Sequence, residues 1–276
     1  SLGTLAVARG RYEDDRLYNL EEIFHAKANG NGSERSSMWG GRIALDKEGY
    51  IYVTLGDRQW PSSGDLWAHP AQSLTNHNGT TVRLYADGSV PDDNPLVGRE
   101  NALPEIWTWG HRNAQGIAIH PETGDVWSNE HGPQGGDEVN LLRSGSNYGW
   151  PVVGYGVNYR TGLAIHHGTQ QDGMDDPAHV WVPSIGVSGM IFYTGDAFPE
   201  WKGDMFVGGM SGERLVRLRI EGEEVVSEEI ILQDMGRIRE VQQGLDGLIY
   251  LAIDGGTRWE DGPPTQIIRL EPAGMR

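Results

Sequence analysis

The sequence predicts an all-β protein of the β-propeller class, because one strand–turn–strand unit recurs along it. The unit is a strand, a glycine-containing turn and an apolar strand, and it appears at Gly41–Asp57, Gly116–Gly132, Gly189–Gly209 and Val241–Gly256. Turns flanked by alternating, β-forming residues are the signature of hairpins. Copies of one hairpin joined by long connections favour radial repetition, as in a propeller, and leave a β-sandwich as the alternative.

The segments between these hairpins fit as outer strands of the same blades. Candidates are Thr80–Ser89, Arg214–Val225 and Gln266–Pro272. Residues 5–24 have the pattern of outer strands whose inner partners are missing, so we expect residues 1–276 to form a single propeller domain that begins mid-blade. Helical periodicity is nearly absent, and its best candidate is the short segment Asn19–Lys27.

The composition limits the classes of partner. The net charge is −17, from 22 basic and 39 acidic residues, and such a field repels nucleic acid and anionic membranes. The sequence has no run of 18 apolar residues, so no membrane span is expected, and no signal-peptide pattern opens it. The absence of cysteine excludes disulfides and thiolate metal ligands.

The stretch Trp107–Trp150 gathers the residues best suited to binding chemistry. Arg112 and Asn113 follow a Trp-x-Trp strand, and together they can present a guanidinium fork and an amide to a planar anion. The alternative is that both side chains satisfy loop carbonyls. Aromatic residues suited to a sugar or a flat cofactor follow, although they equally suit core packing; they are Tyr148, Trp150, Tyr155 and Tyr159.

A Gly-Pro-rich acidic loop, Glu130–Glu138, is a candidate calcium site. Gly132 and Pro133 expose backbone carbonyls, and Asp137 and Glu138 add carboxylates, which are the oxygen ligands that Ca²⁺ prefers. A merely acidic turn is the alternative, and His131 has no second histidine at ligand spacing.

Arg237 and Arg239 lie two positions apart on a predicted strand, so both point to one face. In so acidic a chain this pair favours an anionic ligand, with ion pairing to Asp or Glu as the alternative.

Six strings in the sequence are specific enough to indicate a family. In chain order they are LGDR (Leu55–Arg58), GHRNAQG (Gly110–Gly116), NEHGPQGGDEVN (Asn129–Asn140), NYGWP (Asn147–Pro151), GVNY (Gly156–Tyr159) and RIREV (Arg237–Val241). With them, essentially the whole chain resembles the soluble PQQ-dependent aldose sugar dehydrogenases of the glucose/sorbosone dehydrogenase family. The resemblance implies a six-bladed propeller, periplasmic or secreted, monomeric or homodimeric, with pyrroloquinoline quinone (PQQ) and Ca²⁺ on one face.

The resemblance also implies roles for particular residues. Arg112 and Asn113 match contacts to the quinone, and Tyr159 matches a sugar contact. The carbonyls of Gly132 and Pro133 match the ligands of the Ca²⁺ beside PQQ, whereas Glu138 and Tyr148 match a second, structural Ca²⁺ site. The remaining cofactor-binding positions are Gly209, Met210, Ser211, Arg237, Ile238 and Arg239.

The implied reaction is hydride transfer from the anomeric carbon of an aldose to PQQ, giving a lactone, with electrons passed to an external acceptor. Ca²⁺ and Arg112 stabilise the charge that develops on the quinone oxygen. The base of the family is a histidine just before the Gly-Gly-Arg string, and here that position is Met38, which has no proton-accepting nitrogen.

Two further departures from the family pattern stand beside Met38. A lysine that some members place against PQQ falls on Ser211, and the N-terminal blade region has no counterpart before Ser1. We therefore keep two alternatives to the dehydrogenase, which are a non-catalytic PQQ- or sugar-binding propeller and a metal-dependent lactonase. The lactonase needs several carboxylates around one metal, and the sequence offers only Asp137 and Glu138.

Overall fold

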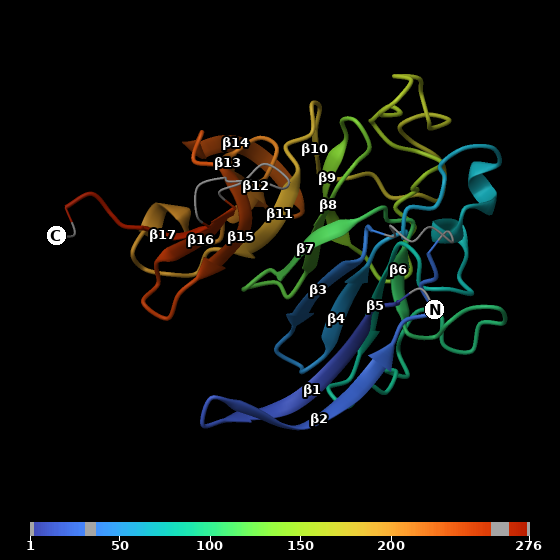
Figure 1. Ribbon diagram of the computed structural model, residues 1–276, viewed down its shortest axis with the longest axis horizontal. Coiled ribbons are helices and arrows are strands. Elements are labelled where there is room, and N and C mark those ends of the chain that lie inside the picture. The colour runs from blue at the N-terminus through green and yellow to red at the C-terminus, as the bar shows by residue number, and fades with distance from the viewer. Residues whose placement is uncertain (1–2, 31–36, 255–264, 275–276) are drawn as a thin grey trace. The chain divides into compact units, whose positions relative to one another are not determined.

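The computed structural model describes residues 3–30, 37–254 and 265–274, and it is built almost entirely of antiparallel strands. The chain divides into two compact units, which are described separately. Figure 1 labels the strands. Unit 1 comprises residues 1–114, 143–154 and 165–175, and unit 2 comprises residues 115–142, 155–164 and 176–276. The predicted all-β class is confirmed.

Unit 1 contains one complete four-stranded sheet of the blade type. Its strands follow one another in chain order, which is the meander expected of a blade; they are β3 (Gly40–Leu45), β4 (Ile51–Leu55), β5 (Thr80–Leu84) and β6 (Ile106–Trp109). β4 and β5 are buried along their whole length, because both of their faces are covered. Two short 3₁₀ turns, η1 (Leu66–Ala68) and η2 (Pro70–Gln72), lie in the connection between them.

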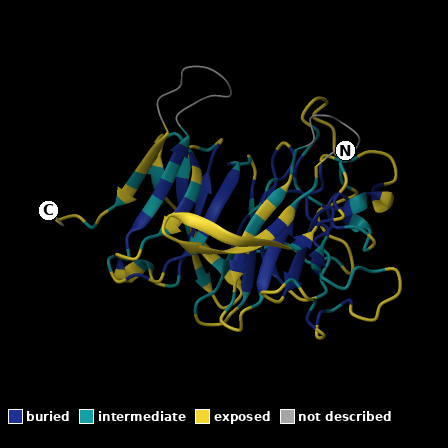
Figure 2. Cartoon of the chain, turned by 60° about the horizontal axis from the view of Figure 1, so that its bottom comes forward, coloured by how far each residue is buried: buried dark blue, intermediate teal, exposed yellow. Residues whose placement is uncertain are grey.

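A two-stranded sheet, β1 (Ala6–Glu13) and β2 (Arg16–His25), precedes this blade. Most of its side chains are exposed, as the yellow hairpin in Figure 2 shows, and only its base packs on the blade through Val7 and Phe24. The helix predicted at Asn19–Lys27 is therefore wrong, because the cross-strand ladder with β1 takes the backbone hydrogen bonds of this segment.

Unit 2 contains two further four-stranded sheets and one with three strands. The first runs β10-β9-β8-β7, from β7 (Ala114–Ile119), β8 (Val126–Glu130), β9 (Asp137–Leu142) and β10 (His179–Trp181). The second runs β11 to β14, from β11 (Val187–Phe192), β12 (Met205–Gly209), β13 (Arg214–Glu221) and β14 (Glu224–Gln233), with η3 (Pro199–Trp201) before β12. The third consists of β15 (Arg237–Gln243), β16 (Ile249–Asp254) and β17 (Gln266–Leu270).

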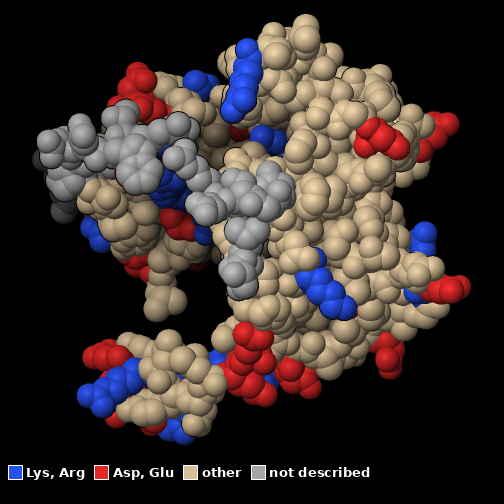
Figure 3. Space-filling model, turned by 45° about the vertical axis from the view of Figure 1, so that its right-hand side comes forward, with Lys and Arg blue, Asp and Glu red and all other residues tan. Residues whose placement is uncertain are grey.

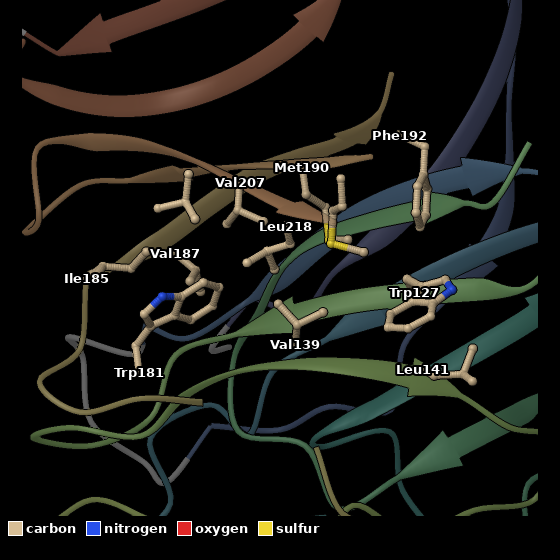
Figure 4. Close-up of a cluster of buried hydrophobic side chains, with 12 residues drawn as sticks. Trp127, Val139, Leu141, Trp181, Ile185, Val187, Met190, Phe192, Val207 and Leu218 are labelled. Carbon is tan, nitrogen blue, oxygen red and sulfur yellow. The ribbon is translucent and has the colours of Figure 1, made fainter. Parts of the chain in front are cut away.

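The core of unit 2 fills the spaces between adjacent sheets. Figure 4 shows Trp127, Val139 and Trp181 from one sheet meeting Val187, Met190 and Phe192 at the start of the next. A second cluster, which includes Phe206, Leu215 and Ile249, joins the next pair of sheets. Each fully buried large apolar side chain contributes about 1.5–3 kcal/mol to the stability of the folded chain. These packed layers therefore hold in place the strand ends from which the loops emerge.

All four predicted hairpins occur, as β3–β4, β7–β8, β11–β12 and β15–β16, although Gly256 at the end of the last lies outside the described residues. The predicted outer strands correspond to β5, β13 and β17. Acidic and basic side chains are interspersed in small groups on the face drawn in Figure 3. Among the described residues, none of the helices has the length and apolar character that a bilayer crossing requires.

Candidate functional site

In unit 1, three segments that the sequence analysis singled out lie together at the ends of strands. Met38 precedes β3, and its carbonyl accepts a hydrogen bond of 3.2 Å from the amide of Arg58, just after β4. The amide of Gly40 donates to Oδ1 of Asn113, after β6, at 3.3 Å. The Met38 loop, the LGDR string and the Arg112-Asn113 pair therefore lie together in one cluster.

Arg112 is buried in this cluster and lies against an aromatic ring. Its guanidinium carbon is 5.2 Å from the centre of the Trp150 indole, within the range of a cation–π contact. Its carbonyl accepts the amide hydrogen of Asp57 at 2.8 Å, and Trp150 Nε1 donates to Asp57 Oδ2 at 2.8 Å. The indole thus orients both a cation and a carboxylate.

Asp57 and His69 are members of this cluster that sequence reasoning did not single out. Asp57 is almost fully buried within the LGDR string, and Nε2 of His69 lies 4.0 Å from its Oδ2. Burial lowers the pKa of His69 to about 4, so its imidazole is neutral at pH 7. Asp57 could have been found from its position at a strand end within the LGDR string. His69 could not, because the connection in which it lies has no recognisable sequence pattern.

Tyr148 and Trp150 pack inward rather than presenting aromatic surface to solvent. The Tyr148 ring stacks on His111 at 4.8 Å, and its hydroxyl accepts the amide hydrogen of Arg143. Asn147 reaches the same cluster through a hydrogen bond to Gln72. For Tyr148 and Trp150, the packing alternative is therefore the observed one.

In unit 2, the loop between β8 and β9 contains the predicted carbonyl ligands. Gly132 can have no side chain, because a Cβ would come within 2.2 Å of the Gly136 carbonyl oxygen. The Gly132 end of the loop therefore lies directly against its Gly136 end. The hydroxyl of Tyr159 donates to the Pro133 carbonyl at 2.8 Å, so the predicted sugar contact and the predicted cation ligand touch each other.

Two carboxylates face each other at the base of this loop. Glu130 and Glu138 are directly opposite each other across the β8–β9 ladder. The side-chain Nδ2 of Asn140 donates a hydrogen bond to each carboxylate, at 3.1 Å to Glu130 and 3.4 Å to Glu138. Burial and the charge of Glu130 raise the pKa of Glu138 well above its usual value. Like charges opposite each other on a sheet are destabilising, and either protonation of Glu138 or a bound cation relieves that repulsion.

Asp137, which the sequence suggested as a further carboxylate ligand, is bonded to backbone instead. Its oxygens accept hydrogen bonds from the amides of Gly132, Gly186 and Val187. The imidazole of His131 likewise donates to the Val187 carbonyl at 2.6 Å. No group of three or more His, Asp or Glu side chains with metal-binding geometry lies in the part of the chain that the structure describes.

Arg237 and Arg239 project from β15 to one side, as predicted, whereas Ile238 between them is fully buried on the other. Both guanidinium groups reach the sulfur of Met210, at 3.9 and 3.0 Å. Arg239 also forms a two-pronged ion pair with Asp254, at 3.0 and 2.7 Å. The predicted cationic face and the alternative of ion pairing are therefore both present.

The Gly209–Ser211 turn lies against Gly186, whose carbonyl accepts the amide hydrogen of Met210 at 2.8 Å. A Cβ on Gly186 would approach the Ser211 hydroxyl to 2.7 Å, which shows how close the two segments are. Unit 2 thus brings Met210 and Ser211 together with the two arginines. A cavity of about 380 Å³ elsewhere in unit 2, bordered by His120, Asp204 and Arg217, includes none of the predicted site residues.

The comparisons with known proteins identify the family. Residues 2–260 match the family model described as Glucose / Sorbosone dehydrogenase. The chain belongs to this family. It is 37% identical to Aldose sugar dehydrogenase YliI of Escherichia coli (strain K12), over 90% of this chain and 66% of that protein. A protein of Synechocystis, slr1608, is 36% identical over 96% of this chain and 63% of its own length, so the chain spans a little under two thirds of these curated relatives.

The solved structures give the fold. A crystal structure of a glucose dehydrogenase is 42% identical and superposes with a TM-score of 0.80, covering 90% of this chain and 70% of that one. The PQQ-bound form of an aldose sugar dehydrogenase from Streptomyces coelicolor is 24% identical, with a TM-score of 0.72, over 96% and 71% of the two chains. The predicted β-propeller class is confirmed.

Proposed function

We propose that this chain is part of a quinoprotein that oxidises aldoses at the anomeric carbon, with PQQ as cofactor and Ca²⁺ beside it. The observation that carries the proposal is the convergence of Arg237 and Arg239 on the Met210–Ser211 turn, in a chain of net charge −17. Two guanidinium groups on one face suit a ligand with several carboxylates, because each can form paired, charge-assisted hydrogen bonds.

The residues present fit both groups. Ser211 can donate a hydrogen bond to an anionic ligand where some relatives carry a lysine, and Met210 gives the arginines a polarisable neighbour. For Ca²⁺, the carbonyls of Gly132 and Pro133 supply hard oxygen ligands, and the opposed carboxylates of Glu130 and Glu138 supply negative charge at the other end of the same loop.

When bound, PQQ would accept the hydride of the sugar, and Ca²⁺ would polarise the quinone. The residues of this chain supply orientation and charge. Arg112, held over Trp150, and Asn113, which accepts a hydrogen bond from Gly40, have fixed positions from which to donate to an oxygen that gains charge. Tyr159 is exposed, and its hydroxyl oxygen can accept a hydrogen bond from a sugar hydroxyl while its O–H group donates to the Pro133 carbonyl.

Proton removal from the sugar hydroxyl is the step that this chain supports least. Met38 stands where the family has its base, and a thioether accepts no proton at pH 7. Loss of a general base costs about 10²–10⁴-fold in rate. This observation favours a second candidate function, a propeller that binds PQQ and sugar without turnover.

The test separates binding from turnover. Apoprotein is titrated with PQQ, with and without Ca²⁺, and followed by quenching of tryptophan fluorescence; dye reduction is then measured with a panel of aldoses. We expect Ca²⁺-dependent PQQ binding together with slow dye reduction. Binding without any turnover selects the second candidate, and a lack of PQQ binding rejects both.

A further inference from the structure

Asp137 holds three separate segments of unit 2 in one arrangement. Oδ1 accepts the amide hydrogen of Gly132 at 3.0 Å, and Oδ2 accepts those of Gly186 and Val187 at 2.6 and 3.1 Å. The side chain is only 1% exposed. Charge-assisted hydrogen bonds are each worth about 1.5–3 kcal/mol, so a buried carboxylate with three of them is a strong local constraint.

The constraint continues beyond the residues that Asp137 touches. Gly186 accepts the amide hydrogen of Met210 through its carbonyl at 2.8 Å, and Gly212 donates to the Ile185 carbonyl at the same distance. The Met210–Ser211 turn is therefore fixed to the segment that Asp137 holds. The chain of contacts runs from the Gly132 loop through the carboxylate to the turn that faces the two arginines.

The surroundings of Asp137 are rigid, so small displacements are transmitted. Asp137 is the first residue of β9 and pairs with Trp181 of β10, and Val187 is the first residue of β11. Figure 4 shows Trp181, Ile185 and Val187 within one buried cluster. Because close-packed interiors shift as blocks rather than yielding atom by atom, a change in the Gly132 loop has a direct route to Gly186.

We infer that Asp137 is a positioning residue that couples the Gly132–Pro133 carbonyl loop to the Met210–Ser211 turn, so that binding of a cation at the first strengthens binding of a carboxylate-bearing ligand at the second. The inference deepens the proposed function and rests on it for the identity of the two ligands. The coupling itself rests on the hydrogen bonds of this chain.

The first test needs no ligand. Asp137→Asn keeps the size of the side chain but sets an NH₂ group against backbone N–H donors. Asp204→Asn makes the same change at another buried carboxylate of unit 2, which lies at the opposite end of β12 from the Met210–Ser211 turn. In apoprotein, hydrogen exchange of residues 131–136, 185–187 and 209–212 should rise together in the Asp137 variant by about 10–100-fold, the effect of losing one such bond. Asp204→Asn should leave these segments unchanged. Faster exchange in residues 131–136 alone would overturn the coupling.

The second test measures binding. Affinity for Tb³⁺ or Ca²⁺ and for PQQ is determined separately and then together, well below the unfolding temperature of each variant. Wild type should bind PQQ more tightly with Ca²⁺ present, and Asp137→Asn should lower both affinities about tenfold and weaken the mutual enhancement, leaving only the part that comes from Ca²⁺ lying beside PQQ. Wild-type affinities in a destabilised Asp137 variant would make its role purely structural.

A third measurement covers the case in which Asp137→Asn does not fold. Ca²⁺ added to the wild-type chain should slow exchange in residues 185–187 and 209–212 as well as in 131–136; protection confined to 131–136 would contradict the coupling. If the wild type binds neither Ca²⁺ nor PQQ, the proposed function fails, while the exchange pattern of the apoproteins still decides whether Asp137 couples the segments.

Discussion

The predicted site residues of unit 1 and those of unit 2 differ in what they retain of the family pattern. In unit 2 the residues proposed to bind ligand are all present, because Arg237 and Arg239 share one face and the Gly132–Pro133 loop is tightly folded. In unit 1 Arg112 and Asn113 are held in place, but Met38 stands at the position where the resemblance implies a histidine base. On the proposed function, ligand binding and proton transfer can therefore be tested separately.

The backbone at Met38 makes the contrast sharper. Its φ is +56°, a left-handed conformation that few non-glycine residues adopt and in which histidine is several-fold enriched. The carbonyl of Met38 still accepts the Arg58 amide hydrogen. The loop thus keeps a conformation that suits histidine, although the side chain is a thioether.

The largest effect should come from restoring the base. Met38→His is expected to raise dye-linked aldose oxidation by about 10²–10⁴-fold, the usual worth of a general base, with PQQ affinity little changed. The rate of the variant should follow the deprotonation of a group with a pKa in the histidine range. Steady-state kinetics from pH 5 to 9 measure both.

Met38→Gln is the matched control, because it has a polar side chain of similar length that cannot act as a base near pH 7. Equal gains in both variants would mean that the polarity of the loop, not proton transfer, limits the rate. If neither variant oxidises aldoses faster than wild type although PQQ is bound, the residue at position 38 does not limit the rate.

The buried His69 should make stability depend on pH. The pKa of His69 is lowered to about 4 in the folded chain, against about 6.5 unfolded, so the neutral form stabilises the fold above pH 6.5 and this contribution is lost as the pH falls towards 4. The loss should reach roughly 3 kcal/mol, from the size of the pKa difference. Urea unfolding at pH 7 and at pH 4.5 measures it.

His69→Asn separates this contribution from those of other groups. His69 Nδ1 accepts the amide hydrogen of Ala71 at the start of η2, and asparagine can cap that turn without titrating. The variant should lose less stability than wild type on acidification. An identical pH dependence of the two proteins would remove His69 as a cause.

A smaller change is expected from the arginine pair. Arg239→Gln should weaken PQQ binding by about 10–100-fold, since it removes a charge-assisted hydrogen bond worth about 1.5–3 kcal/mol. Arg219→Gln is the control, because Arg219 is exposed and pairs with Glu221 at 2.7 Å on β13. Equal losses in the two variants would point to net charge, and not to the face shared with Arg237.

The sequence predicted those features that depend on local pattern. Hairpin turns and strand alternation located β3–β4, β7–β8 and β11–β12, and period-two spacing placed Arg237 and Arg239 on one face. The pattern failed at Asn19–Lys27, where pairing with β1 decides the structure. It also could not show that the Asp137 oxygens accept backbone amides of Gly186 and Val187, because those contacts join residues about fifty positions apart.

The smallest predicted effect concerns the contact between Tyr159 and Pro133. The hydroxyl proton of Tyr159 draws electron density from the carbonyl that is proposed to bind the cation. Tyr159→Phe should therefore tighten Ca²⁺ binding by roughly 2–10-fold, the range of one neutral hydrogen bond, while raising KM for the sugar. Tyr155→Phe, in the same loop, is the control for calorimetric titration. Weaker Ca²⁺ binding in the Tyr159 variant would instead mean that the hydroxyl holds the Pro133 carbonyl in place, making Tyr159 a support of the cation loop and not a competitor for its ligand.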